Sequence, residues 1–72
     1  MNIEMIPVGS SRIAEMGYDE TNAIVYVRFP NGKAWQYTFV PLSIWGDFVA
    51  SDSKGRFIHD VLDHYDHGPA DI

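Results

Sequence analysis

The strongest constraint in this sequence is a pair of strand-like segments joined by an Asn-Gly turn. β-branched and aromatic residues dominate Ala23–Phe29, which is the composition of a strand. Asn31 and Gly32 follow, and this dipeptide tolerates the positive φ angles of a tight hairpin. In the next segment, Ala34–Val40, large aromatic side chains alternate with small or polar ones. The pattern predicts an antiparallel hairpin with one face buried (the dry face) and the other exposed to solvent.

Alternation also assigns each side chain of this hairpin to a face. The residues expected on the dry, helix-covered face are Ala23, Val25, Val27, Phe29, Trp35, Tyr37 and Phe39. The opposite face receives Ile24, Tyr26 and Arg28. A domain of 72 residues has few other large side chains to bury. We therefore interpret the strand aromatics as core rather than as a platform for stacking nucleic-acid bases.

After Val40 the apolar period changes from two to nearly four, which predicts helices. Pro41 suits the first turn of a helix because its missing N–H needs no partner there. The apolar stripe expected for this first helix is Ile44, Trp45, Phe48 and Val49. Asp52 or Ser53 can cap a second helix. Its expected stripe is Phe57, Ile58, Val61, Leu62 and Tyr65.

The two ends of the chain carry weaker signals. Residues 1–9 are mostly apolar and contain Pro7, which predicts an N-terminal arm or an edge strand. Arg12–Tyr18 can run extended before a turn. Residues 66–72 have no period and contain Gly68 and Pro69, which predicts a flexible C-terminal tail. The fold class is therefore α+β: a single domain over residues 1–65, with a three- to four-stranded antiparallel β-meander followed by two short helices packed on one face.

Charge restricts the kind of partner. Ten Asp and Glu against five Lys and Arg give a formal net charge of −5, which disfavours a general phosphate-binding surface and attracts basic protein surfaces. From Phe57 onward there is no Lys or Arg. We expect the basic residues to be dispersed or paired with acids. They are Arg12, Arg28, Lys33, Lys54 and Arg56.

Catalysis, metals and cofactors are not predicted. No cysteine is present, and no motif places a histidine beside a serine as a nucleophile requires. His64 and His67 are spaced as two metal ligands can be, but their span crosses a predicted helix end, so we interpret them as a solvated polar face. No segment has the length of a membrane span. The expected location is the cytoplasm.

Several short motifs, in this order and spacing, resemble the KTSC family, small domains that occur at the end of some lysyl-tRNA synthetases. The motif residues are Ser10-Ser11 with Ile13, Gly17-Tyr18-Asp19, Phe29, Gly32, Trp35-Gln36-Tyr37, Val40-Pro41 and Ser53-Lys54-Gly55. The resemblance implies a small RNA-binding accessory domain, a role inferred for the family from its occurrence with a synthetase. Where members often carry Phe-Asn and a later Arg, this chain has Ile58-His59 and Asp63, which removes basic character.

As a small, acidic, single-domain member of that family, this chain is also similar to antitermination proteins of Xanthomonas bacteriophages. This resemblance implies a phage-type transcription regulator in the bacterial host cytoplasm. It would bind host RNA polymerase at the β′ N-terminal segment and the β flap near the RNA exit channel, with an elongation factor as a further partner. It would inhibit initiation at host promoters and act as an antiterminator. The RNA-binding accessory domain is the alternative.

The sequence nominates polymerase-contacting residues only by elimination, as side chains of the arm and of the sheet face away from the helices. They are Ile3, Met5, Ile24, Tyr26 and Arg28. A tyrosine beside an arginine is a common composition for an interface anchor. In the alternative arrangement, the arm itself covers Ile24 and Tyr26.

Overall fold

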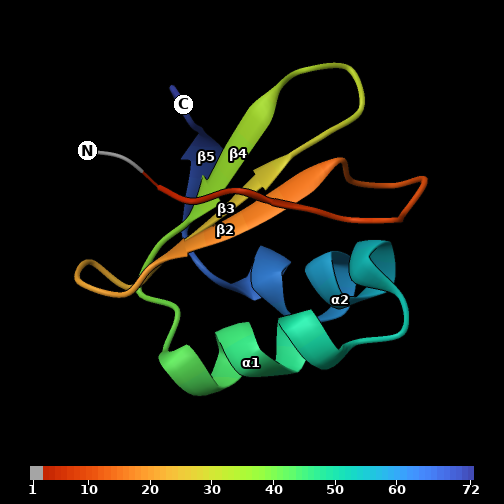
Figure 1. Cartoon of the computed structure of the whole chain (residues 1–72). Coiled ribbons are helices and arrows are strands. Elements are labelled where there is room, and N and C mark those ends of the chain that lie inside the picture. The colour runs from red at the N-terminus through yellow and green to blue at the C-terminus, as the bar shows by residue number, and fades with distance from the viewer. Residues whose placement is uncertain (1–2) are drawn as a thin grey trace.

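A computed structural model describes residues 3–72, which form a five-stranded antiparallel sheet with helices on one face (Figure 1). The strands neighbour one another in chain order: β1 (Ile6–Pro7), β2 (Glu15–Asp19), β3 (Ile24–Arg28), β4 (Ala34–Tyr37) and β5 (His67–Pro69). Between β4 and β5 lie α1 (Leu42–Ala50), α2 (Lys54–Asp60) and a 3₁₀ turn, η1 (Leu62–His64). The α+β class with helices on one face is confirmed, and the sheet is wider than the sequence predicted.

The β3–β4 hairpin forms as its Asn-Gly turn predicts. Val25 pairs with Tyr37 and Val27 pairs with Trp35 across the hairpin. Gly32 has a φ of 88°, a backbone conformation that glycine adopts without steric cost. The hairpin places two rows of side chains against the helix layer.

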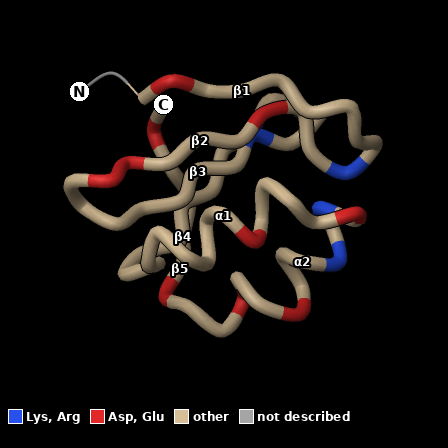
Figure 2. The backbone as a smooth tube through the Cα atoms, turned by 60° about the horizontal axis from the view of Figure 1, so that its bottom comes forward, with Lys and Arg blue, Asp and Glu red and all other residues tan. Residues whose placement is uncertain are grey.

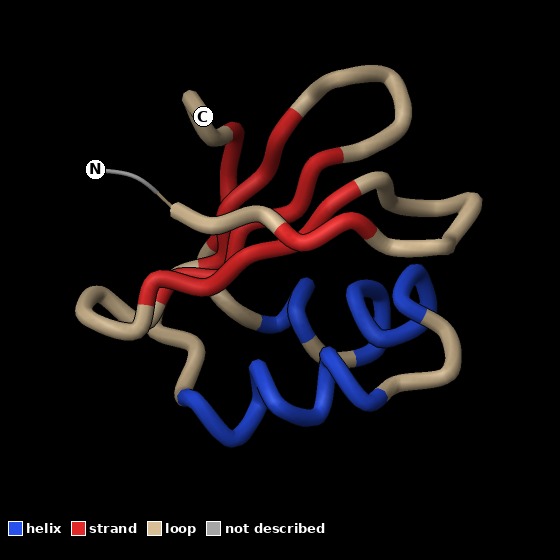
Figure 3. The backbone as a smooth tube through the Cα atoms, viewed as in Figure 1, coloured by secondary structure: helices blue, strands red, loops and turns tan. Residues whose placement is uncertain are grey.

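The core lies between the sheet and the helices, as the two layers of Figure 3 show. It contains side chains from the strands, from the connections and from each helical segment. Its members are Ile13, Met16, Val25, Val27, Tyr37, Val40, Phe48, Ile58 and Leu62. Phe48 stands at its centre and stacks on Phe57 with ring centroids 5.2 Å apart.

The prediction that Phe39 is a core residue is wrong, because the strand alternation stops at Tyr37. Phe39 has a φ of 58° and its side chain is 78% exposed. The N–H of Val40 donates to the carbonyl of Ala23 at 2.9 Å. The left-handed backbone at Phe39 therefore turns Val40 into the core in its place.

Two details of the helices also differ from expectation. Val49 was expected in the buried stripe of α1 but is 45% exposed, because it lies about 100° around the helix axis from Phe48. The expected cap of α2 was Asp52 or Ser53, and it is Ser53, whose hydroxyl accepts from the N–H of Arg56 at 3.3 Å. A single helix reaching Tyr65 is wrong, because Val61 leaves helical geometry at φ −121° and the chain tightens into η1.

The prediction of an unstructured tail over residues 66–72 is wrong for His67–Pro69, which form β5 on the edge of the sheet. Gly68 pairs with Gln36, and the N–H of Ala70 donates to the carbonyl of Ala34 at 3.0 Å. An edge strand accommodates Pro69 because the outward side of the strand needs no backbone donor. Three residues with a Gly-Pro pair carry too little pattern for sequence analysis to find such a strand.

Within residues 3–72, no helix is both long enough and apolar enough to cross a bilayer.

Candidate functional site

The sheet face away from the helices, called here the outer face, is where the sequence placed the partner contacts. Strand register aligns its side chains in rows. One row contains Gly17, Tyr26, Gln36 and Gly68. A second contains Glu15, Arg28 and Ala34.

The N-terminal arm packs on this outer face over Gly17. A Cβ atom at Gly17 would lie 2.8 Å from the Glu4 carbonyl oxygen and 2.8 Å from the Met5 sulfur. The Ile3 Cγ2 would lie slightly farther from this Cβ, at 3.1 Å. Tyr26, the neighbour of Gly17 in the row, is only 9% exposed. Of the two arrangements that the sequence left open, the structure has the one in which Tyr26 is covered.

Arg28 is held by contacts within the chain. Its Nε donates to Glu15 Oε1 at 3.0 Å, and its two terminal nitrogens donate to the carbonyls of Gly32 at 3.0 Å and Ile72 at 2.9 Å. The structure therefore brings the five nominated residues onto or beside one face, with Ile3, Met5, Ile24 and Arg28 half-buried. Tyr26 and Arg28 are not free, exposed anchors as the prediction required.

Replacement of Gly17 by Ala is expected to lower the free energy of unfolding by about 1–2 kcal/mol, because the added methyl overlaps a backbone oxygen that has little freedom to move. The matched control is Gly68→Ala in the same row, where a Cβ meets nothing within 4 Å. That change should alter stability by less than about 0.5 kcal/mol. Urea denaturation measures both. Equal effects of the two substitutions would contradict the docking of the arm.

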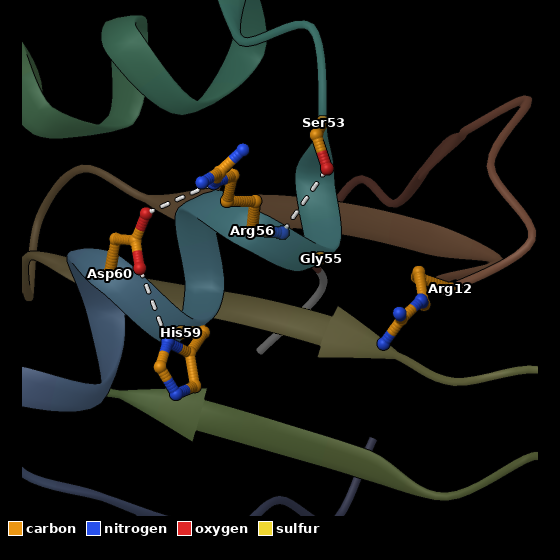
Figure 4. A pocket seen from close by; sticks show the side chains of 6 residues that line it. All are labelled: Arg12, Ser53, Gly55, Arg56, His59 and Asp60. Carbon is orange, nitrogen blue, oxygen red and sulfur yellow. Dashed lines mark hydrogen bonds and ion pairs between the residues drawn. The ribbon is translucent and has the colours of Figure 1, made fainter.

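A second candidate lies between the β1–β2 connection and α2, where a hollow of about 590 Å³ opens (Figure 4). Its lining residues are Arg12, Ser53, Gly55, Arg56, His59 and Asp60. Gly55 lets the aliphatic part of Arg12 pack against α2, since a Cβ there would lie 2.7 Å from Arg12 Cγ. Arg12 thus borders the hollow on one side and the residues of α2 border the other.

The basic residues were expected to be dispersed or paired with acids. Arg28 and Arg56 are paired, with Glu15 and Asp60. Arg12, Lys54 and Arg56 are not dispersed, because they meet around the start of α2. Two of them already have partners. Lys54 Nζ donates to the carbonyls of Ser51 at 2.6 Å and Val49 at 3.1 Å, which closes the end of α1. Arg56 Nε lies 3.6 Å from Asp60 Oδ2. The hollow therefore offers hydrogen-bond donors but little net charge.

The polar groups of the hollow do not form a nucleophile with a base. The Ser53 hydroxyl accepts the capping bond of α2. His59 Nδ1 lies 3.2 Å from Asp60 Oδ1, on a side chain that is 84% exposed. Within residues 3–72, no group of three or more His, Asp or Glu side chains is arranged to hold a metal ion.

The third candidate surface lies at the N-terminal end of α1 and is called here the Phe39 end. It consists of the β2–β3 turn (residues 19–23), Phe39, Leu42 and Asp66. Leu42 is 55% exposed and Phe39, three residues earlier in the chain, is 78% exposed. The N–H of Thr38 donates to the Asp66 carbonyl at 2.8 Å, and the Val40–Ala23 bond joins the turn to the same segment.

A stack of Tyr18 on Trp45 joins β2 and α1 next to the Phe39 end. The Tyr18 ring stacks on Trp45 with centroids 5.4 Å apart, and its hydroxyl donates to the Val40 carbonyl at 2.7 Å. Burial raises the pKa of Tyr18, and the carboxylates of Glu20 and Asp19 raise it further. The local field at this end is therefore negative.

Basic residues are separated from the end of the molecule that holds the β2–β3 turn, whereas acidic residues are spread along the chain. In Figure 2 the Lys and Arg segments lie toward the β1–β2 connection and α2, and the end with the β2–β3 turn shows only acidic segments. Glu20 and Asp66 are exposed at that end. Sequence analysis found the acidic excess but not this separation, because it depends on which turns the fold brings together.

The fold defines a small α+β domain whose helices cover one face of an antiparallel meander, and comparisons with known proteins specify it further. The model of the KTSC domain matches residues 9–65. The crystal structure of a KTSC domain protein from Yersinia pestis is similar with a TM-score of 0.90 and 31% identity, over 97% of this chain and 100% of that one.

Two curated relatives extend the comparison. A protein of Tsukamurella paurometabola is 38% identical over 58 residues, which cover 81% of this chain and 87% of the relative. A protein of Stutzerimonas stutzeri is 29% identical over 65 residues, covering 88% and 92%. This chain belongs to the KTSC domain family.

Proposed function

We propose that this KTSC protein is a non-catalytic transcription regulator that binds a basic surface of bacterial RNA polymerase. The observation that carries the proposal is the Phe39 end, where exposed apolar side chains lie among carboxylates without a nearby Lys or Arg. Charged groups that complement a partner steer its approach, while buried apolar anchors supply affinity. Such a surface fits a basic protein wall better than it fits the phosphates of RNA.

The polymerase as partner rests on the resemblance to small antitermination proteins of Xanthomonas bacteriophages. An acidic domain placed on the basic walls of the RNA exit channel, at the β′ N-terminal segment and the β flap, would exclude an initiation factor that needs the same flap. The same placement would act on termination by changing the path of the emerging transcript. This mechanism requires binding and no chemical step.

Co-migration with core RNA polymerase from a Xanthomonas host tests the proposal, with labelled single-stranded RNA as the competing ligand. We expect a stable complex with core enzyme and none with RNA. Run-off transcription across a terminator then measures readthrough, which should rise. Retention of RNA without binding to polymerase would overturn the proposal.

The RNA-binding accessory domain is a second candidate, and the gathering of Arg12, Lys54 and Arg56 around the hollow favours it. If the hollow binds phosphates, affinity for RNA should fall steeply with salt. Arg12→Gln should then weaken RNA binding, whereas Lys33→Gln should not, because Lys33 lies on the β3–β4 turn and does not line the hollow. Equal effects of both substitutions would exclude the hollow as the RNA site.

A further inference from the structure

Phe39 combines two features that are each unfavourable for a folded monomer. Its backbone has a φ of 58°, a left-handed conformation that is an outlier for a bulky side chain. Its phenyl ring is 78% exposed, so the ring returns little burial energy for this strain. Residues held in such conformations persist where the surrounding structure imposes them, and they concentrate at binding and switch regions.

The strain is imposed by two neighbouring segments. Thr38 is fixed by its bond to the Asp66 carbonyl and Val40 by its bond to the Ala23 carbonyl, at 2.8 and 2.9 Å. Ala23 is itself left-handed at φ 57°. A glycine or asparagine would meet this backbone requirement at position 39 with less strain. The phenyl ring is therefore not needed by the fold.

The charges around Phe39 indicate what kind of partner would cover it. Glu20 and Asp66 are exposed, and they belong to the two segments whose backbone carbonyls bond to the neighbours of Phe39. The Lys and Arg segments visible in Figure 2 lie away from the end with the β2–β3 turn. An apolar anchor flanked by carboxylates complements an apolar pocket rimmed by Lys or Arg.

We infer that Phe39, together with Leu42, is the anchor by which this protein docks into an apolar pocket on a basic protein surface, with Glu20 and Asp66 pairing with the cations at its rim. The inference rests on the proposed function for the identity of the partner, and it names the contact that binds it. It replaces the outer sheet face, whose Tyr26 and Arg28 are occupied within the chain, as the contact surface.

The test compares Phe39→Asn with wild type in binding to core RNA polymerase and to a synthetic amphipathic Lys/Leu peptide, the latter followed by backbone amide shifts in NMR. Phe39→Asn should weaken polymerase binding about tenfold or more. It should leave the thermal midpoint unchanged or raise it. Val49→Ala is the matched control, because it truncates another exposed apolar side chain at the other end of α1, and it should bind as wild type does.

The peptide separates failure of the inference from failure of the proposed function. The peptide should shift the backbone amide signals of residues 20, 39, 42 and 66 of this protein, and these shifts should be smaller in Phe39→Asn and in Glu20→Gln. Such a result supports the anchor even when neither wild type nor any variant binds polymerase. In that case only the choice of partner is overturned. Wild-type and Phe39→Asn proteins that bind polymerase equally would overturn the anchor and keep the proposed function. Peptide shifts that are absent or centred elsewhere also overturn the anchor.

Discussion

Replacement of Phe48 by Ala is expected to lower the free energy of unfolding by about 3–4 kcal/mol, the usual cost of truncating a buried phenylalanine. Phe48 is fully buried and its ring contacts both Trp45 and Phe57, with centroids 6.0 and 5.2 Å away. The truncation would leave a cavity between α1, α2 and the sheet and remove the contacts that Phe48 makes between them. Two-state domains of this size have only about 4–11 kcal/mol of total stability.

Val49→Ala is the matched control, since Val49 follows Phe48 on the same helix but is 45% exposed. It should change stability by less than about 0.5 kcal/mol. Urea denaturation followed by tryptophan fluorescence measures both variants. A loss below about 1 kcal/mol for Phe48→Ala would contradict the placement of α1 against the sheet.

The sequence predicts the β3–β4 hairpin and the helix cap well because each depends on residues close in the chain. Gly32 supplies the positive φ of the turn and Ser53 supplies the cap oxygen. Two of the three buried positions of β3, Val25 and Val27, follow directly from strand alternation. These local rules needed no knowledge of distant contacts.

The errors arise where distant segments decide the local structure. Phe39 leaves the strand pattern because its neighbours bond to Ala23 and to Asp66, which lie 16 and 27 residues away in sequence. β5 forms only because β4 offers an unpaired edge, and its own composition gives no strand signal. Periodicity describes one segment at a time and therefore misses both.

The candidate site shows the same division. The sequence nominated the outer face and the arm by elimination, because no motif identified the contacting residues. Gly17 was a signal in the sequence, since a glycine within a strand often marks the close approach of another backbone. The Phe39 end could not be predicted, because its exposure depends on the backbone conformation of a single residue.

Stability is expected to fall at alkaline pH because Tyr37 holds its proton more strongly in the folded protein than in the unfolded chain. Burial, and then the Asp63 carboxylate, raises the pKa of Tyr37 to about 12, from 10.0 when it is unperturbed. Below pH 10 both states keep the proton, so the stability is fully present. Between pH 10 and 12 the unfolded chain releases the proton while the folded protein keeps it, which favours unfolding.

The expected loss is about 1.4 kcal/mol per pH unit and approaches about 2–3 kcal/mol at pH 12. Other groups titrate in this range, so the measurement is the difference between wild type and Tyr37→Phe in urea denaturation from pH 8 to 11.5. The two stability curves should run parallel below pH 10. Above it the wild type should fall more steeply, because only the wild type has a phenol at position 37, which loses its proton in the unfolded chain and keeps it in the folded protein. Curves that stay parallel throughout would mean that the Tyr37 hydroxyl reaches solvent, and that the sheet and η1 do not close over it.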